Sequence, residues 1–239
     1  MPAMKKELSI TEELVVLAYR SQSRKRQAAT GSNGSFHAML RASLIIELIE
    51  HGRVVLVRQQ DERADTNTYG LRVVSRETTG HRAQDALIAR IDDPDYAAKA
   101  LSWWINDGDA LRAAVDDLVE NSVMVERRRS FGPFTYDYRL EPVDTNRDDA
   151  LRDRFEAVYY NGHEPTDREC LAAAIIYYAD MWPYYAPLGD STARRAFHER
   201  IEGFARRRRA PVSVALSIPD DDVAAVLDTL IIARSGGGH

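Results

Sequence analysis

The sequence predicts a mainly α-helical protein, folded as a single domain with two β-hairpins. Apolar residues recur at helical spacing in most segments between residues 8 and 233. Strand-like patterns appear near residues 53–75 and 123–140. The 239 residues are 44% hydrophobic, which is enough for one packed core, and no linker is long enough to separate two domains. We therefore expect one domain over residues 8–233, with flexible termini at residues 1–7 and 234–239.

The N-terminal part of the chain predicts two amphipathic helices. The first begins with a serine and a glutamate at capping-box spacing, in Ser9-Ile10-Thr11-Glu12. The second carries an apolar residue at every fourth position, namely Phe36, Leu40, Leu44 and Leu48. Gly52 follows it at the position where helices commonly end in a left-handed residue. Residues 21–35 between the helices form a polar loop with the basic run Arg24-Lys25-Arg26.

The first hairpin is expected to pair residues 54–57 with residues 71–74 across a long polar loop, Arg58 to Thr68. Two helices followed by a hairpin are also the outline of a winged-helix module, in which Phe36 to His51 would read DNA. The net charge of −5 and the acidic residues on that helix disfavour an approach to phosphates. A DNA-binding regulator therefore stays an alternative.

Helical patterns fill most of the remaining sequence. Residues 83–119 carry three apolar stripes, the third with Asp109 as its expected N-cap. Thr166 and Glu169 have capping-box spacing before another apolar run. The four arginines 206–209 close a helix, where the helix dipole favours positive charge. The three aspartates 220–222 precede the last helix and are expected to complement its dipole rather than to bind metal.

The second hairpin is the most informative segment. Arg127, Arg128 and Arg129 run toward a Gly-Pro turn that has Phe131 on one side and Phe134 on the other. Local sequence alone favours phenylalanines that fold back onto a neighbouring helix, since most aromatic residues are buried. An exposed aromatic pair beside clustered arginines would instead suit an anionic membrane surface.

No catalytic motif is recognisable. The sequence contains no P-loop, no G-x-G-x-x-G and no G-x-S-x-G, and Pro165 prevents a zinc-protease helix after His163-Glu164. The histidines show no local ligand spacing, and the single cysteine, Cys170, is expected to be a small core residue. We therefore expect neither an enzyme nor a metal or cofactor site. No apolar run approaches the roughly 18–20 residues that span a bilayer, so we expect a cytoplasmic protein whose membrane contact is peripheral.

Several segments, taken in order, resemble the Golgi phosphoprotein 3 family. They cover nearly the whole chain, from about Leu8 to Ile232, and are Ser9 to Tyr19, Ala42 to Val54, Leu118 to Met124, Asp167 to Ala172 and Tyr185 to Leu188. The resemblance implies a mainly helical domain that binds phosphatidylinositol 4-phosphate through a basic pocket beside an apolar hairpin. It also implies that the second hairpin here is the exposed one.

The resemblance places the family's pocket arginine on Arg41. The family's pocket tryptophan has no counterpart, and two other basic pocket positions fall on Gly108 and Leu111. Family members also occur in bacteria, and the Ala- and Arg-rich composition suits a bacterial origin.

Together these observations predict a peripheral membrane adaptor for anionic lipid. Arg41 is expected to face an open basic pocket and to contact a headgroup phosphate. Phe131 and Phe134 are expected to enter the acyl boundary, within the positive field of Arg127, Arg128 and Arg129. Anionic phospholipid and the tails of membrane proteins are the expected partners, and nucleic acid is not. A protein scaffold without lipid binding is the third alternative.

Overall fold

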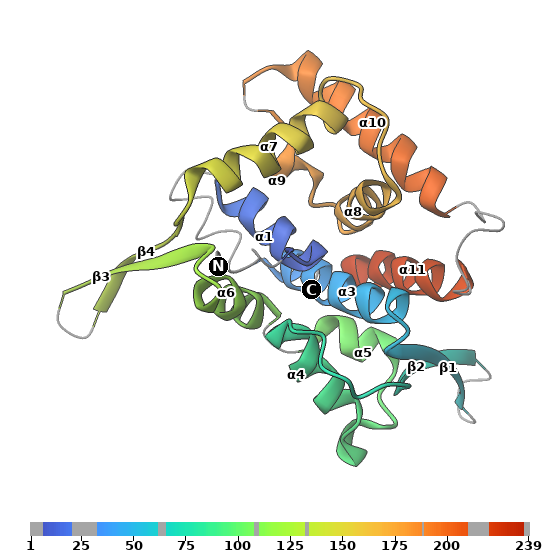
Figure 1. Cartoon of the computed structure of the whole chain (residues 1–239). Helices are drawn as coiled ribbons and strands as arrows, with labels where there is room; N and C mark the ends of the chain where they lie inside the picture. The colour runs from blue at the N-terminus through green and yellow to red at the C-terminus, as the bar shows by residue number, and fades with distance from the viewer. Residues whose placement is uncertain are drawn as a thin grey trace.

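The computed structural model of the protein describes residues 7–20, 33–61, 66–107, 110–131, 134–187, 189–209 and 220–236. These residues are mainly helical, with two separate antiparallel two-stranded sheets, as predicted (Figure 1). The helices are α1 (Ile10–Arg20), α3 (Gly34–Glu50), α4 (Arg82–Ile91), α5 (Leu101–Asn106), α6 (Ala110–Glu120), α7 (Thr145–Tyr159), α8 (Asp167–Tyr178), α9 (Trp182–Tyr185), α10 (Ser191–Arg209) and α11 (Asp220–Gly236), with a 3-10 turn at Pro94–Tyr96. None of the helices within these ranges is both long and apolar enough to cross a membrane.

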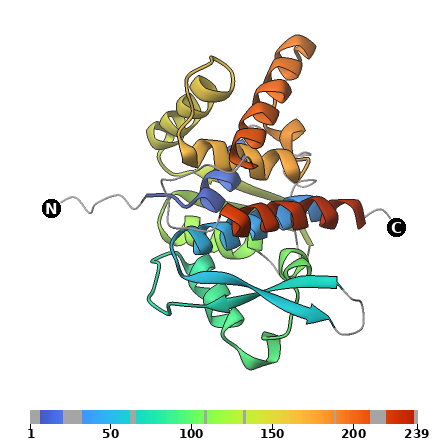
Figure 2. The same ribbon diagram turned by 90° about the vertical axis from the view of Figure 1, so that its right-hand side faces the viewer.

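Helix α3 is the centre of the fold. Its N-cap Asn33 accepts hydrogen bonds from the backbone N–H groups of Ser35 (2.8 Å) and Phe36 (3.3 Å). Beyond the first turn its side chains are buried on all sides, because α1, α4, α5, α6, α8 and α11 pack around it (Figures 1 and 2). A recognition helix must present a free face to a DNA groove. The structure therefore removes the basis of the winged-helix alternative, which assigned DNA reading to this helix.

The start of α1 is fixed by hydrogen bonds within the helix and from α3. Ser9 and Glu12 form the predicted capping box: Ser9 N donates to Glu12 Oε2 (2.7 Å), and Glu12 N donates to Ser9 Oγ (3.1 Å). The next two N–H groups turn to Glu47 of α3, with Ile10 N 2.6 Å from Oε1 and Thr11 N 3.4 Å from Oε2. A carboxylate from one helix thus caps the N-terminus of another, where unpaired N–H groups and the helix dipole favour negative charge.

Glu47 is almost completely buried, with 2% of its surface exposed. Burial raises the pKa of its carboxyl group, while the Ile10 N–H group and the Arg168 guanidinium act in the opposite direction. Arg168 of α8 lies 3.9 Å from Glu47 Oε1 and also donates to the carbonyl of Leu8 (2.6 Å). This one carboxylate therefore joins α1, α3 and α8.

The first hairpin is longer than predicted. Strand β1 (Val54–Asp61) pairs with β2 (Thr66–Val73) from Val54↔Val73 to Asp61↔Thr66. Most of the segment expected to be a polar loop is therefore paired strand. The cross-strand ladder uses backbone groups, so polar side chains do not prevent pairing.

The second hairpin forms where it was predicted. Strand β3 (Met124–Phe131) pairs with β4 (Phe134–Pro142), and the hairpin extends outward from the helical body beside α6 (Figure 1).

Several helix ends also match the sequence interpretation. Gly52 follows α3 with φ +65°, a conformation that glycine adopts without strain. Thr166 and Glu169 form both hydrogen bonds of a capping box at α8.

Helix α11 differs from the expectation at both ends. It contains the aspartates 220–222 in its first turn and runs to Gly236, beyond the expected start of the C-terminal tail. Asp109 and the outermost terminal residues lie outside the described ranges.

Replacing Glu47 by alanine should lower the free energy of unfolding by about 2–4 kcal/mol, because buried N–H groups of α1 lose their acceptor. Urea titration followed by circular dichroism measures this loss. Glu50→Ala is the matched control, since Glu50 lies on the same helix but is only half-buried. It should change stability by less than about 1 kcal/mol. Equal losses in the two variants would contradict the capping role of Glu47.

The raised pKa of Glu47 also predicts a pH dependence. Because the pKa of Glu47 is raised, its carboxyl group binds a proton more tightly in the folded protein than in the unfolded chain. This tighter binding adds to the free energy of unfolding in full below the ordinary pKa of 4.5, and the contribution is lost as the pH rises through the pKa of the folded state. The difference in unfolding free energy between the wild type and Glu47→Gln should therefore move against the wild type as the pH rises. Urea titrations of both proteins across this pH range check the sign of the change. The contributions of other titrating groups cancel in the difference between the two proteins. A difference that moves in favour of the wild type would show that the pKa is lowered instead.

Candidate functional site

The hairpin β3–β4 is positioned by the end of α6. After α6, Ser122 adopts φ +53°, and Val123 N donates to the carbonyl of Leu118 (2.8 Å). Val143 N then donates to the carbonyl of Val123 (3.0 Å), which joins the two ends of the hairpin at its base. The ladder continues outward to its last pair, Phe131↔Phe134, with an irregularity between Arg129 and Ser130.

The hairpin places the predicted aromatic pair at its far end. Phe131 and Phe134 stand opposite each other as the final residues of the two strands. Closer to the body, Arg128 stands opposite Tyr138, and Arg129 opposite Asp137. The side chains of these residues, and the connecting residues 132–133, lie outside the described part of the chain, so the expected exposure of the two rings stays a prediction.

Arg127 is the one member of the arginine triplet whose side chain the structure describes, and it is 66% exposed. Its Nε lies 3.4 Å from Oε2 of Glu141 on β4. A second ion pair at the base joins Arg112 of α6 to Glu126 of β3 (2.7 Å). The positive charge of the triplet is therefore partly balanced near the body, which weakens its field relative to three isolated arginines.

Arg41 does not occupy the expected position. It lies on the buried helix α3, and only 7% of its surface is exposed. Leu111, which stands where the family has a basic pocket residue, is buried as well, and Gly108 lies outside the described residues. The prediction that Arg41 faces an open basic pocket is therefore wrong. The periodicity of α3 indicated one apolar face, whereas the fold covers this helix on every side.

The basic cluster at the end of α10 does not join the hairpin in one surface. Arg206 and Arg207 at the end of α10 pair with Glu202 (2.6 Å) and Glu164 (2.9 Å). This end of α10 lies on the opposite side of the molecule from the hairpin (Figure 1). The basic run at residues 24–26 is outside the described ranges.

Two exposed valines near the hairpin base were missed by the sequence analysis. Val119, in the last turn of α6, is 37% exposed although it was assigned to the apolar stripe of that helix. Val143, directly after β4, is 54% exposed. An apolar residue after Pro142 carries no periodic signal, so only the tertiary structure shows that it is uncovered.

The structure is a mainly helical domain with a projecting hairpin that has arginines along one strand and phenylalanines at its end. This is the architecture that the resemblance to the Golgi phosphoprotein 3 family implied. The family model described as Golgi phosphoprotein 3 (GPP34) matches residues 10–225, and the chain belongs to this family. No curated protein matches the chain. The bacterial origin suggested by the composition stays a prediction.

The placement of Arg41 and Arg127 predicts opposite effects of two alanine substitutions. Arg41→Ala should lower the free energy of unfolding by about 2–4 kcal/mol, because it removes a buried side chain together with its packing and polar contacts. Arg127→Ala should change stability by less than about 1 kcal/mol, since exposed ion pairs contribute little. Thermal and urea denaturation of both variants tests the assignment. An Arg41→Ala protein as stable as the wild type would restore an accessible role for Arg41.

Proposed function

We propose that the protein is a peripheral membrane adaptor, without catalytic activity, that binds anionic lipid headgroups on the cytoplasmic surface of a membrane. By family resemblance, the lipid is phosphatidylinositol 4-phosphate. Membership of the Golgi phosphoprotein 3 family and the projecting hairpin β3–β4, which ends in Phe131 and Phe134, support this function. The single observation that carries the proposal is this aromatic pair at the end of a ribbon that extends from the body (Figure 1).

The proposed attachment combines apolar and electrostatic contributions. Burial of two phenylalanine rings contributes about 3–6 kcal/mol, which alone gives dissociation constants of roughly millimolar to tens of micromolar. Arg127, Arg128 and Arg129 add about 1 kcal/mol each near an anionic surface. Because Arg127 lies beside Glu141, its share falls at the low end, and binding should weaken as salt screens the remaining charge.

In this function the hairpin arginines contact the lipid headgroups, and Arg41 stabilises the domain from its interior. The tails of membrane proteins are the second class of partner, which the protein binds while the hairpin holds it at the membrane. A scaffold that binds proteins but no lipid remains the competing function.

A Phe131→Ser/Phe134→Ser double variant should fold as the wild type does and lose at least tenfold in vesicle binding, because the apolar contribution is removed. Cosedimentation with phosphatidylcholine vesicles that contain phosphatidylinositol 4-phosphate measures binding. Vesicles with phosphatidylserine at matched charge, and with phosphatidylcholine alone, separate headgroup recognition from general charge. Val74→Ser is the matched control, since Val74 is 59% exposed beside the other hairpin.

Unchanged binding of the double variant would remove the hairpin from the membrane contact. Failure of the wild type to bind any of the three vesicles would favour the scaffold alternative.

A further inference from the structure

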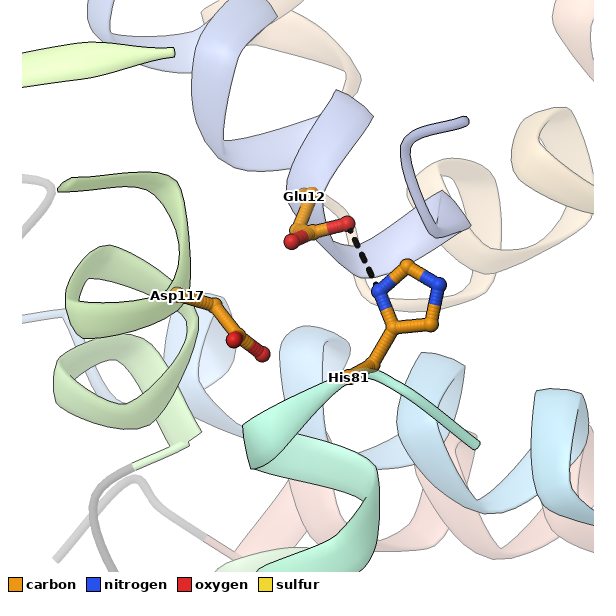
Figure 3. A group of neighbouring side chains, drawn as sticks. All are labelled: Glu12, His81 and Asp117. Carbon is orange, nitrogen blue, oxygen red and sulfur yellow. Dashed lines mark ion pairs between the residues drawn. The ribbon is translucent and has the colours of Figure 1, made fainter. Parts of the chain in front are cut away.

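Three metal-ligating side chains from distant parts of the sequence meet beside the first turn of α1. Glu12 comes from α1, His81 from the residue before α4, and Asp117 from α6 (Figure 3). One candidate ligand atom from each residue lies within 4.8 Å of the other two. Glu12 and Asp117 are buried, and His81 is largely covered, with 17% of its side chain exposed.

The histidine is not used as a helix cap. His81 occupies the N-cap position of α4, but its side chain makes no capping hydrogen bond. That N-terminus is served instead by Asp117, whose Oδ2 accepts from Ala83 N (3.0 Å). The imidazole is therefore turned away from its own helix, toward Glu12 (Figure 3).

The contact between His81 and Glu12 is close but is not a hydrogen bond. His81 Nδ1 forms an ion pair with Glu12 Oε2 at 3.1 Å, but the contact does not meet the geometry of a hydrogen bond, and the buried nitrogen makes none. A buried nitrogen without a hydrogen bond is uncommon in proteins and often marks a functional site. A cation placed among the three side chains would use this nitrogen and both carboxylates at once.

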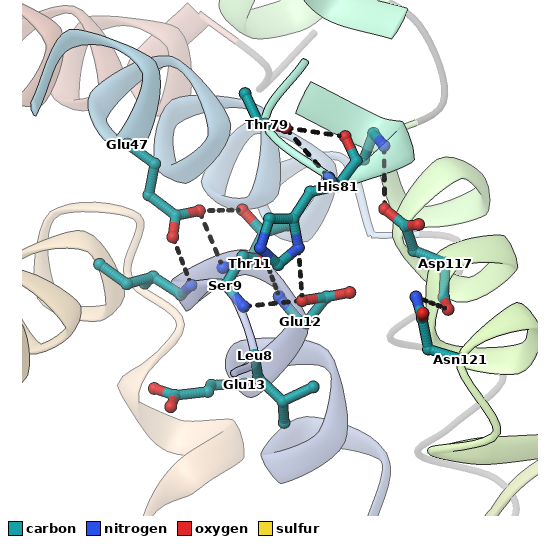
Figure 4. Close-up of polar contacts among 12 residues, drawn as sticks. Leu8, Ser9, Thr11, Glu12, Glu13, Glu47, Thr79, His81, Asp117 and Asn121 are labelled. Carbon is teal, nitrogen blue, oxygen red and sulfur yellow. Dashed lines mark hydrogen bonds and ion pairs between the residues drawn. The ribbon is translucent and has the colours of Figure 1, made fainter. Parts of the chain in front are cut away.

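The surrounding structure holds the three groups in place. Glu12 Oε2 accepts from Ser9 N (2.7 Å), and His81 is fixed through its backbone, with His81 N donating to Thr79 Oγ1 (3.0 Å) and Thr79 Oγ1 donating to the His81 carbonyl (3.2 Å) (Figure 4). Backbone and side-chain partners of this kind orient ligands in metal sites.

We propose that Glu12, His81 and Asp117 bind a divalent transition-metal ion, with Zn²⁺ as the best match. Imidazole selects transition metals over Mg²⁺ and Ca²⁺, and Zn²⁺ accepts histidine nitrogen together with carboxylate oxygen. Its ligand distances of about 2.0–2.2 Å require ligand atoms about 3.3–3.5 Å apart, so the group must contract slightly on binding. Two carboxylates and one neutral imidazole compensate the charge of the ion.

The fourth coordination position is assigned to water. A surface depression adjoins Asp117 and is also lined by Gly80, Arg82, Asp85, Ala86, Glu120 and Asn121. An ion would approach Asp117 from this depression and would bring its water ligand with it. The bound ion would tie together α1, the start of α4 and α6, the helix that leads into β3, so the site is a structural clamp rather than a catalytic centre.

Zn²⁺ titration of the untagged full chain after chelator dialysis tests the proposal. Calorimetry should give one ion per chain, and the melting temperature should rise with Zn²⁺ and fall again with chelator. Co²⁺ should give the visible absorption of a low-coordinate nitrogen and oxygen site. His81→Gln and Asp117→Asn should each weaken Zn²⁺ binding at least tenfold, whereas His163→Gln, at an exposed histidine, should leave it unchanged.

Each outcome decides for or against the site. Absence of stoichiometric binding to the wild type overturns the proposal, and so does binding that survives in Asp117→Asn. Asparagine keeps an oxygen acceptor for Ala83 N, so this variant decides the matter even where His81→Gln does not fold. If His163→Gln loses as much Zn²⁺ affinity as His81→Gln and Asp117→Asn do, the ion binds elsewhere.

Discussion

The rest of the structure depends on the buried carboxylate of Glu47. The first turn of α1 leaves backbone N–H groups without acceptors inside its own helix, and two of them are met by this side chain of α3. Helix α1 lies between two groups of helices, with α4, α5 and α6 on one side and α7 to α10 on the other (Figure 1). Its attachment to α3 therefore determines how both groups meet the centre of the domain.

Asp117 repeats this arrangement at a second helix. It reaches from α6 to the N-terminus of α4, as Glu47 reaches from α3 to the N-terminus of α1. Both contacts lie in one polar region between the helices (Figure 4). Capping between helices adds a tertiary contact to the local sequence signals, so each helix is more stable when its partner is in place. This coupling is a physical reason for the domain to fold as a unit.

Much of the fold could be predicted from the sequence, because amphipathic stripes and caps are local signals. The capping boxes at Ser9 and Thr166, the end of α3 at Gly52 and both hairpins followed directly from them. The burial of Arg41 could not be predicted, since periodicity identifies an apolar face but not a helix surrounded on all sides. The extent of β1 and β2 was also missed, because the paired residues within the expected loop, 58–61 and 66–68, are all polar and carry no apolar alternation. The group of Glu12, His81 and Asp117 has no sequence signal, as its members meet only through packing.

The opposite placement of the hairpin and the end of α10 gives the molecule a polarity. When β3–β4 points toward a surface, the arginine-rich end of α10 points away from it, into the surrounding solution. Glu164 and Glu202 hold two of those arginines by exposed ion pairs, which an acidic partner could exchange at little cost. If the hairpin attaches the protein to a membrane as proposed, the end of α10 stays accessible from solution, and the packed helices between the two ends set their separation.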